Sequence, residues 1–238
     1  MRRVFLACAL LGAVTACSLP AAKPSSGAPV VFLGDSLAAE AAQYLPALLS
    51  PRPLVNQFLA GTAGCDWFGK DLAITSDSVV VISFTGNSGT PCMSDGADGY
   101  LQGQAIVDKY RTDVSVLTET ARSAGAEVLL VGQPARVDDA SGNDLVNGLN
   151  AVYEELAGQN GVAFVDAGAA VENPDGTFAL LLPCVPNELE CDPSGSNVVR
   201  SDDGVHFCPG PRPVGPCPTY LSGAFRFAKA IADAILRA

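Results

Sequence analysis

The chain has 238 residues and a formal net charge of −11 at pH 7, with 25 acidic residues against 14 lysines and arginines. Such an acidic surface disfavours nucleic acids and anionic lipid headgroups as partners, because both would be repelled. The residues from position 30 onward suffice for one α/β domain with a well-buried core, and the sequence contains no internal repeat and no second linker.

The first residues are typical of an export signal. Arg2 and Arg3 precede an almost wholly apolar run over residues 4–14, which is too short to span a bilayer as a helix. The run ends in Val14-Thr15-Ala16-Cys17, which resembles the bacterial lipobox, although that pattern prefers leucine where Val14 stands. The resemblance predicts a lipid on Cys17 and an exported protein anchored to the cell membrane on its extracytoplasmic side. Ordinary signal cleavage nearby is the alternative.

A flexible tether is expected between the anchor and the folded part. Residues 17–29 are rich in Pro, Ser, Ala and Gly and show no apolar periodicity. The chain therefore divides into a signal peptide (1–16), a tether (17–29) and one domain (30–238).

The cysteine count agrees with lipidation. Of eight cysteines, Cys8 lies in the signal and Cys17 would carry the lipid. The remaining six can form three disulfides in an oxidising exterior. Because they lack Cys-x-x-Cys spacing and the chain has a single histidine, we expect no metal site. These six are Cys65, Cys92, Cys184, Cys191, Cys208 and Cys217.

Short apolar runs alternate with helical patterns along the domain. The runs lack strict polar alternation, which is typical of strands buried on both faces of a parallel sheet. They predict strands at 30–33, 53–58, 78–84, 127–131 and 162–165, and helical spacing covers 37–49, 99–123, 143–157 and 222–237. This order predicts a three-layer α/β/α sandwich around a central, mainly parallel five-stranded sheet.

One region breaks this alternation. Residues 182–218 contain eight prolines and four cysteines, and no clear helix or strand is predicted there. Loops of this length are usually functional or disordered.

A serine and the only histidine of the chain stand in contexts that suit nucleophilic catalysis. Gly34-Asp35-Ser36-Leu37 follows the first predicted strand, so Ser36 would lie at the carboxyl edge of the sheet, where such folds bind ligands. His206, in Asp203-Gly204-Val205-His206, is the only imidazole available to take a proton from it. The alternatives are an Asp/Ser helix cap and an ordinary surface histidine.

These motifs resemble those of the SGNH hydrolase superfamily, the GDSL-type esterases and lipases, across essentially the whole domain. The resemblance implies an SGNH/flavodoxin-like fold in which Ser36 is the nucleophile, His206 takes its proton and Asp203 orients the imidazole. Asp166, at the end of the fifth predicted strand, and Asp202 are alternative partners for His206. Asp202 fits the family spacing less well than Asp203, and we expect both to be surface or capping carboxylates. The chain has no Gly-x-Ser-x-Gly elbow.

The family's oxyanion donors match two further blocks. Gly61, by its spacing from Asn56, resembles the glycine whose backbone N–H faces the oxyanion, with Gly64 as a close competitor. Asn87 resembles the asparagine that donates its side-chain amide, and the backbone N–H of Ser36 would be the third donor. Ser88 stands where the family has aspartate, so the local support of Asn87 must differ.

The cysteines near these blocks suggest a bracing role. A Cys65–Cys92 bridge would join the two oxyanion loops, Cys208–Cys217 would hold the loop of His206, and Cys184–Cys191 would staple the long loop. Six cysteines allow fifteen pairings, so this connectivity is a hypothesis.

The resemblance implies a serine hydrolase that cleaves carboxylic esters through an acyl-enzyme, with no cofactor. The anchor favours O-acyl groups on envelope glycans, or lipid esters, as substrates. An O-acyltransferase using the same site and a non-catalytic envelope protein that binds acylated glycan are the alternatives.

Overall fold

The computed structural model describes residues 27–96, 99–137, 140–188, 191–210, 217 and 219–237. The expected signal peptide, Cys17 and most of the tether lie outside the described residues. In the described part of the chain, no helix is both long and apolar enough to cross a membrane.

The centre of the fold is a parallel five-stranded sheet in the order β2-β1-β3-β4-β5. All five predicted strands are present, within a few residues of their expected ends. Every residue of β1 and β3 is buried, whereas the edge strands β2 and β5 are partly exposed, which explains why the central runs are the most apolar. The strands are β1 (Val30–Gly34), β2 (Leu54–Phe58), β3 (Val79–Ser83), β4 (Glu127–Val131) and β5 (Ala163–Val165).

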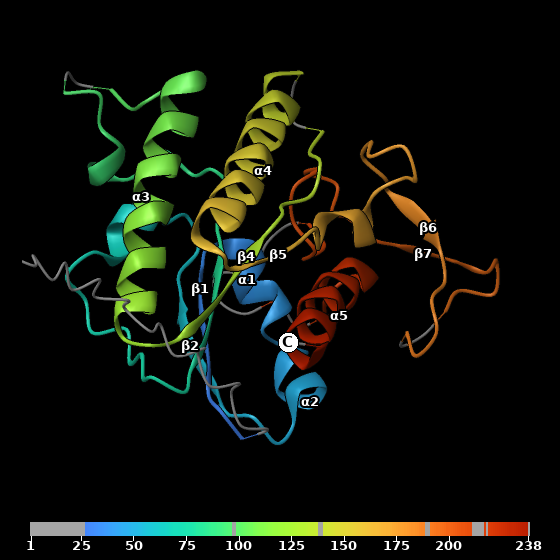
Figure 1. Ribbon diagram of the computed structural model, residues 1–238. Coiled ribbons are helices and arrows are strands. Elements are labelled where there is room, and N and C mark those ends of the chain that lie inside the picture. Colours follow the sequence, from blue (N-terminus) through green and yellow to red (C-terminus); the bar gives the residue numbers. More distant parts are fainter. Residues whose placement is uncertain are drawn as a thin grey trace, which may run out of the picture.

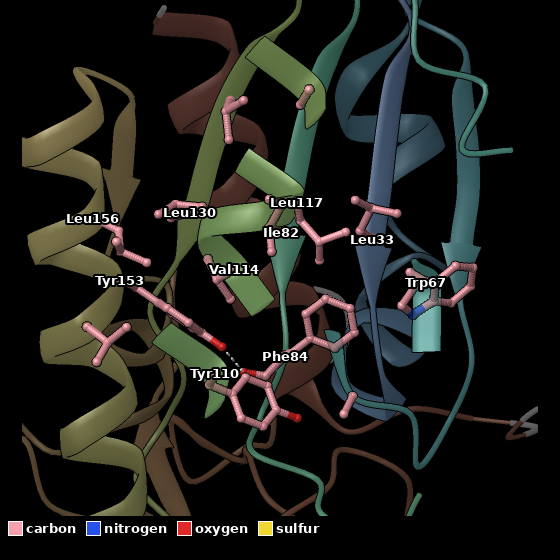
Figure 2. Packing of buried hydrophobic residues seen from close by; sticks show 14 of the residues in the cluster. Leu33, Trp67, Ile82, Phe84, Tyr110, Val114, Leu117, Leu130, Tyr153 and Leu156 are labelled. Atoms are coloured by element: carbon pink, nitrogen blue, oxygen red, sulfur yellow. Dashed lines mark hydrogen bonds between the residues drawn. The ribbon is translucent and has the colours of Figure 1, made fainter. Parts of the chain in front are cut away.

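Helices cover both faces of the sheet, so the predicted three-layer sandwich is confirmed (Figure 1). On one face, α3 (Gln104–Ser123) and α4 (Ala140–Asn160) pack against alternate strand residues such as Leu33 and Ile82. Figure 2 shows this layer, in which side chains of α3 and α4 meet those of β1, β3 and β4. The opposite face packs against α1 (Ser36–Ala41), α2 (Leu45–Leu49) and α5 (Ser222–Arg237).

The helices differ from prediction in their bounds. The helix expected over 37–49 is two short helices, because Pro46 has no N–H to donate to the preceding turn. The helix expected from 99 begins only at Gln104, after Gly103 with its φ of +51°.

The prediction that residues 182–218 contain no strand is wrong. β6 (Leu181–Pro183) and β7 (Ser196–Val198) pair antiparallel, and a disulfide between Cys184 and Cys191 closes the segment between them. In Figure 1 this hairpin lies beyond α5, away from the central sheet. Each strand has only three residues and is partly exposed, so no apolar pattern indicated it.

Candidate active site

Ser36 is placed by the tight passage from β1 into α1. A Cβ on Gly34 would lie 2.3 Å from the Cβ of Ala38 and 2.5 Å from the backbone oxygen of Ser83, so only glycine fits there. Ser36 is the first residue of α1, and the N–H groups of a first helical turn have no acceptor within the helix. The turn therefore presents both a hydroxyl and a backbone donor at the carboxyl edge of the sheet.

His206 lies between Ser36 and Asp203. Its Nε2 is 2.9 Å from Ser36 Oγ, and its Nδ1 is 2.9 Å from Asp203 Oδ2. The other oxygen of Asp203 accepts the backbone N–H groups of Val205 and His206, both at 2.9 Å. A carboxylate fixed in this way holds the imidazole with Nδ1 protonated and Nε2 facing the hydroxyl.

The two alternative partners of His206 have other contacts. Asp166 Oδ1 accepts the N–H of Ala169 at 3.2 Å, in the short helix η3 (Gly168–Val171). Asp202 Oδ1 accepts the hydroxyl of Ser201 at 3.0 Å. Asp203 is therefore the carboxylate that we retain as the candidate orienting group.

The buried carboxylate of Asp35 joins the serine turn to the loop after β3. Its Oδ2 accepts the backbone N–H of Thr85 at 2.6 Å, the Thr85 hydroxyl at 2.7 Å and the Asn87 amide at 2.9 Å. Its Oδ1 accepts the Leu37 N–H at 3.3 Å. Burial raises the pKa of Asp35 to about 6, against the opposing effects of the bonds from Thr85 and Leu37 and the charge of Arg136.

The sequence indicates this carboxylate only as part of an Asp/Ser helix cap. It does cap α1 through the Leu37 N–H, but its contact with Asn87 was not predicted. It accepts a hydrogen bond from the Asn87 amide, and so supports the residue whose local support the sequence left open. The Asn87 backbone oxygen also accepts the Tyr110 hydroxyl of α3 at 2.9 Å. Both contacts join residues far apart in the sequence, so no local pattern could indicate them.

Asn87 is oriented toward the loop that follows β2. Its Nδ2 donates to the backbone oxygen of Thr62 at 3.2 Å as well as to Asp35. Donation to an oxyanion would therefore replace the longer bond, to Thr62, and keep the one to Asp35.

The two competing glycines differ in environment. Gly61 is exposed, has a φ of +80°, and a Cβ there would contact nothing within 4 Å. Gly64 is buried in η1 (Gly64–Trp67), where an added Cβ would meet Asp113 and Leu117 of α3. We retain Gly61 as the candidate donor because Gly64 faces the helix layer.

Three disulfides are formed in the pairing that the sequence favoured: Cys65–Cys92, Cys184–Cys191 and Cys208–Cys217. The first links η1 to η2 (Pro91–Met93), and so joins the loops that carry Gly61 and Asn87. The third begins two residues after His206. Among the described residues, no group of three or more His, Cys, Asp or Glu side chains is placed to bind a metal ion.

The fold is that of the GDSL-type, or SGNH, hydrolases, as comparison with solved structures shows. A GDSL-like lipase from Bacteroides thetaiotaomicron is 17% identical, with a TM-score of 0.53 over 91% of this chain and 92% of that chain. The acetylxylan esterase Axe2 from Geobacillus stearothermophilus is 16% identical, with a TM-score of 0.56 over 90% and 96%. At this identity the likeness establishes the fold alone.

The chain belongs to the DUF459 family, which is described as proteins of unknown function and whose model matches residues 29–211. That range contains Ser36, Asn87, Asp203 and His206. The comparison with curated proteins gives no match.

Proposed function

We propose that this protein is a serine hydrolase that cleaves carboxylic esters through an acyl-enzyme intermediate. The observation that carries the proposal is the continuous line of hydrogen bonds from Ser36 Oγ through His206 to Asp203, with 2.9 Å at each step. A nucleophile in contact with a base that a third group orients is the arrangement this chemistry requires. The shared fold with esterases and lipases adds support by analogy.

In the proposed reaction, His206 Nε2 takes the proton of Ser36 as its oxygen attacks the ester carbonyl. Asp203 stabilises the resulting imidazolium without itself accepting the proton. The negative charge on the carbonyl oxygen is held by the N–H groups of Ser36 and Gly61 and by the Asn87 amide.

Collapse of this intermediate breaks the ester bond and leaves the acyl group on Ser36. The imidazolium gives its proton to the departing alcohol. Water, activated by the neutral imidazole, then attacks the acyl-enzyme, releases the carboxylic acid and restores Ser36.

For the substrate, we propose O-acyl groups on envelope glycans, or lipid esters. The sequence features at the N-terminus support this, because a lipid on Cys17 and a short tether would hold the domain near the cell envelope. The acetylxylan esterase among the similar structures acts on an acylated glycan, which supports the same class by analogy only.

The experiment is labelling of the purified protein with a fluorophosphonate probe, together with hydrolysis of p-nitrophenyl acetate. We expect labelling and turnover in the wild type, and loss of both in Ser36→Ala and His206→Ala. Ser123→Ala, which removes an exposed hydroxyl at the end of α3, is the matched control and keeps both. Labelling that persists in Ser36→Ala would refute the assignment, and adding sugar acceptors would separate hydrolysis from acyl transfer.

A further inference from the structure

Arg200 is a fully buried arginine directly before the turn that carries Asp203 and His206. Its Nη2 donates to the backbone oxygen of Ala135 at 2.8 Å. Its Nε and Nη1 are buried and have no hydrogen-bond partner within the described part of the chain. Burying a guanidinium is costly unless its charge is compensated, so its position needs an explanation.

The turn formed by residues 201–206 is closed at its base. The backbone N–H of Ser201 donates to the backbone oxygen of His206 at 2.7 Å. Phe207 follows the turn directly, and the guanidinium carbon of Arg200 lies 5.1 Å from the centre of its ring. The residues immediately before and after the turn therefore contact each other through a stacked cation and ring.

This base is tied to two other parts of the site. The backbone N–H of Phe207 donates to the buried carboxylate of Glu40 at 2.6 Å, and Glu40 lies one helical turn after Ser36 on α1. Ala135, which accepts the bond from Arg200, lies in the loop after β4. Arg200 and Phe207 thus link the turn of residues 201–206 to α1, which begins at Ser36, and to the loop between β4 and α4.

The charge of Arg200 is balanced by several carboxylates. Burial lowers the pKa of Arg200 to about 10, and the charges of Glu172, Asp203 and Glu40 act in the opposite direction. The residue therefore stays protonated at neutral pH. Its positive charge therefore acts on Asp203 as well as on Glu172 and Glu40.

We propose that Arg200 is a positioning residue for the reaction proposed above. It holds the turn of residues 201–206 at its base through Phe207 and Ala135, and its positive charge balances the carboxylates around His206. This inference rests on the proposed function. A small displacement of His206 relative to Ser36 would lower the rate strongly, because proton transfer requires close alignment.

The test compares Arg200→Met and Arg200→Lys with Arg226→Met as the matched control. Arg226 is also buried, but it belongs to α5 and pairs with Glu188 at 2.7 Å. For each variant, kcat and KM for p-nitrophenyl acetate are measured per fluorophosphonate-reactive site, with the pH profile of kcat/KM. Counting reactive sites removes the effect of unfolded protein.

For Arg200→Met we expect kcat per site to fall about 10- to 100-fold and KM to change less than about twofold. The reason is that the substitution disturbs the alignment of His206 with Ser36 rather than the binding of the substrate. The acid limb of the pH profile should move upward by about half a unit. The sign follows from charge: Arg200 acts against the carboxylates of Asp203, Glu40 and Glu172, so its removal lets them stabilise the imidazolium more strongly, with Arg136 as an opposing cation that remains. Proton release from His206 then needs a higher pH.

Arg200→Lys keeps the charge without the planar stack on Phe207, so it should restore the pH profile but not the full kcat. Arg226→Met should lower the melting temperature and leave kcat per site and the pH profile unchanged. If Arg200→Met does not fold, the test rests on Arg200→Lys. A lowered kcat per site with an unchanged pH profile in that variant would support the positioning role, and an unchanged kcat would overturn it.

An Arg200→Met variant with wild-type kcat per site and pH profile would overturn the positioning role while leaving the proposed function intact. A wild type that neither reacts with the probe nor hydrolyses the ester would overturn the proposed function, and this inference with it.

Discussion

Asp35 Oδ2 lies 2.9 Å from Asn87 Nδ2, so the residue before the candidate nucleophile holds the candidate oxyanion donor directly. The same oxygen accepts two bonds from Thr85, which makes one carboxylate the junction between the loops after β1 and β3. The position of Asn87 therefore depends on a buried charge.

We predict that Asp35→Asn lowers kcat about 10- to 100-fold, because an amide cannot accept the same set of donors and Asn87 loses its fixed orientation. Ester hydrolysis by the purified variant measures this. An unchanged kcat would show that Asp35 does not support the amide of Asn87.

The same substitution should also change how the free energy of unfolding depends on pH. Because the pKa of Asp35 is raised from 3.8 to about 6 in the folded state, the folded protein binds the extra proton between these values. The free energy of unfolding of the wild type therefore falls by about 3 kcal/mol as pH rises from about 4 to about 6. This fall is measured relative to a variant that lacks the titrating carboxylate. Urea unfolding of wild type and Asp35→Asn across this window tests the sign. A difference independent of pH would contradict it.

We predict that replacing Cys65 and Cys92 together by alanine lowers both stability and kcat. The bridge spans 27 residues, for which the chain-entropy relation gives about 4 kcal/mol, and its loss frees the two oxyanion loops. The matched control replaces Cys184 and Cys191, whose bridge spans 7 residues in the β6–β7 hairpin. It should cost about 2 kcal/mol and leave kcat unchanged. Equal effects of the two double variants on kcat would rule out a bracing role.

We predict that Cys17 carries the lipid anchor in the native host. Metabolic labelling with a fatty acid should mark the wild type and not Cys17→Ser, and the variant should leave the membrane fraction. Mass spectrometry of the mature N-terminus identifies the cleavage site. A mature chain that begins elsewhere and carries no lipid would favour ordinary signal cleavage.

Much of the fold could be predicted because buried parallel strands leave a simple signal. The runs that became β1 and β3 are apolar throughout, and they are buried along their whole length. The hairpin of β6 and β7 left no such signal, since its strands are short and partly exposed and a disulfide closes it.

The candidate site was predictable where it depends on rare residues in short motifs. His206 is the only histidine, and Ser36 directly follows a strong strand signal. The contact of Asp35 with Asn87 and the contacts of Glu40 and Arg200 were not predicted, because they span 52, 167 and 65 residues of sequence. A charged residue in a helix or loop is normally exposed, so the sequence alone indicates solvent rather than a buried contact.

The central claim, that Ser36 forms an acyl-enzyme, is tested most directly by mass spectrometry. The protein is mixed with p-nitrophenyl acetate, quenched in acid and digested, and the acetylated peptides are mapped. The account predicts one acetyl group on Ser36 in the wild type, and none on that peptide in Ser36→Ala or His206→Ala. Ester turnover without acetyl on Ser36, or unchanged turnover in Ser36→Ala, would contradict it.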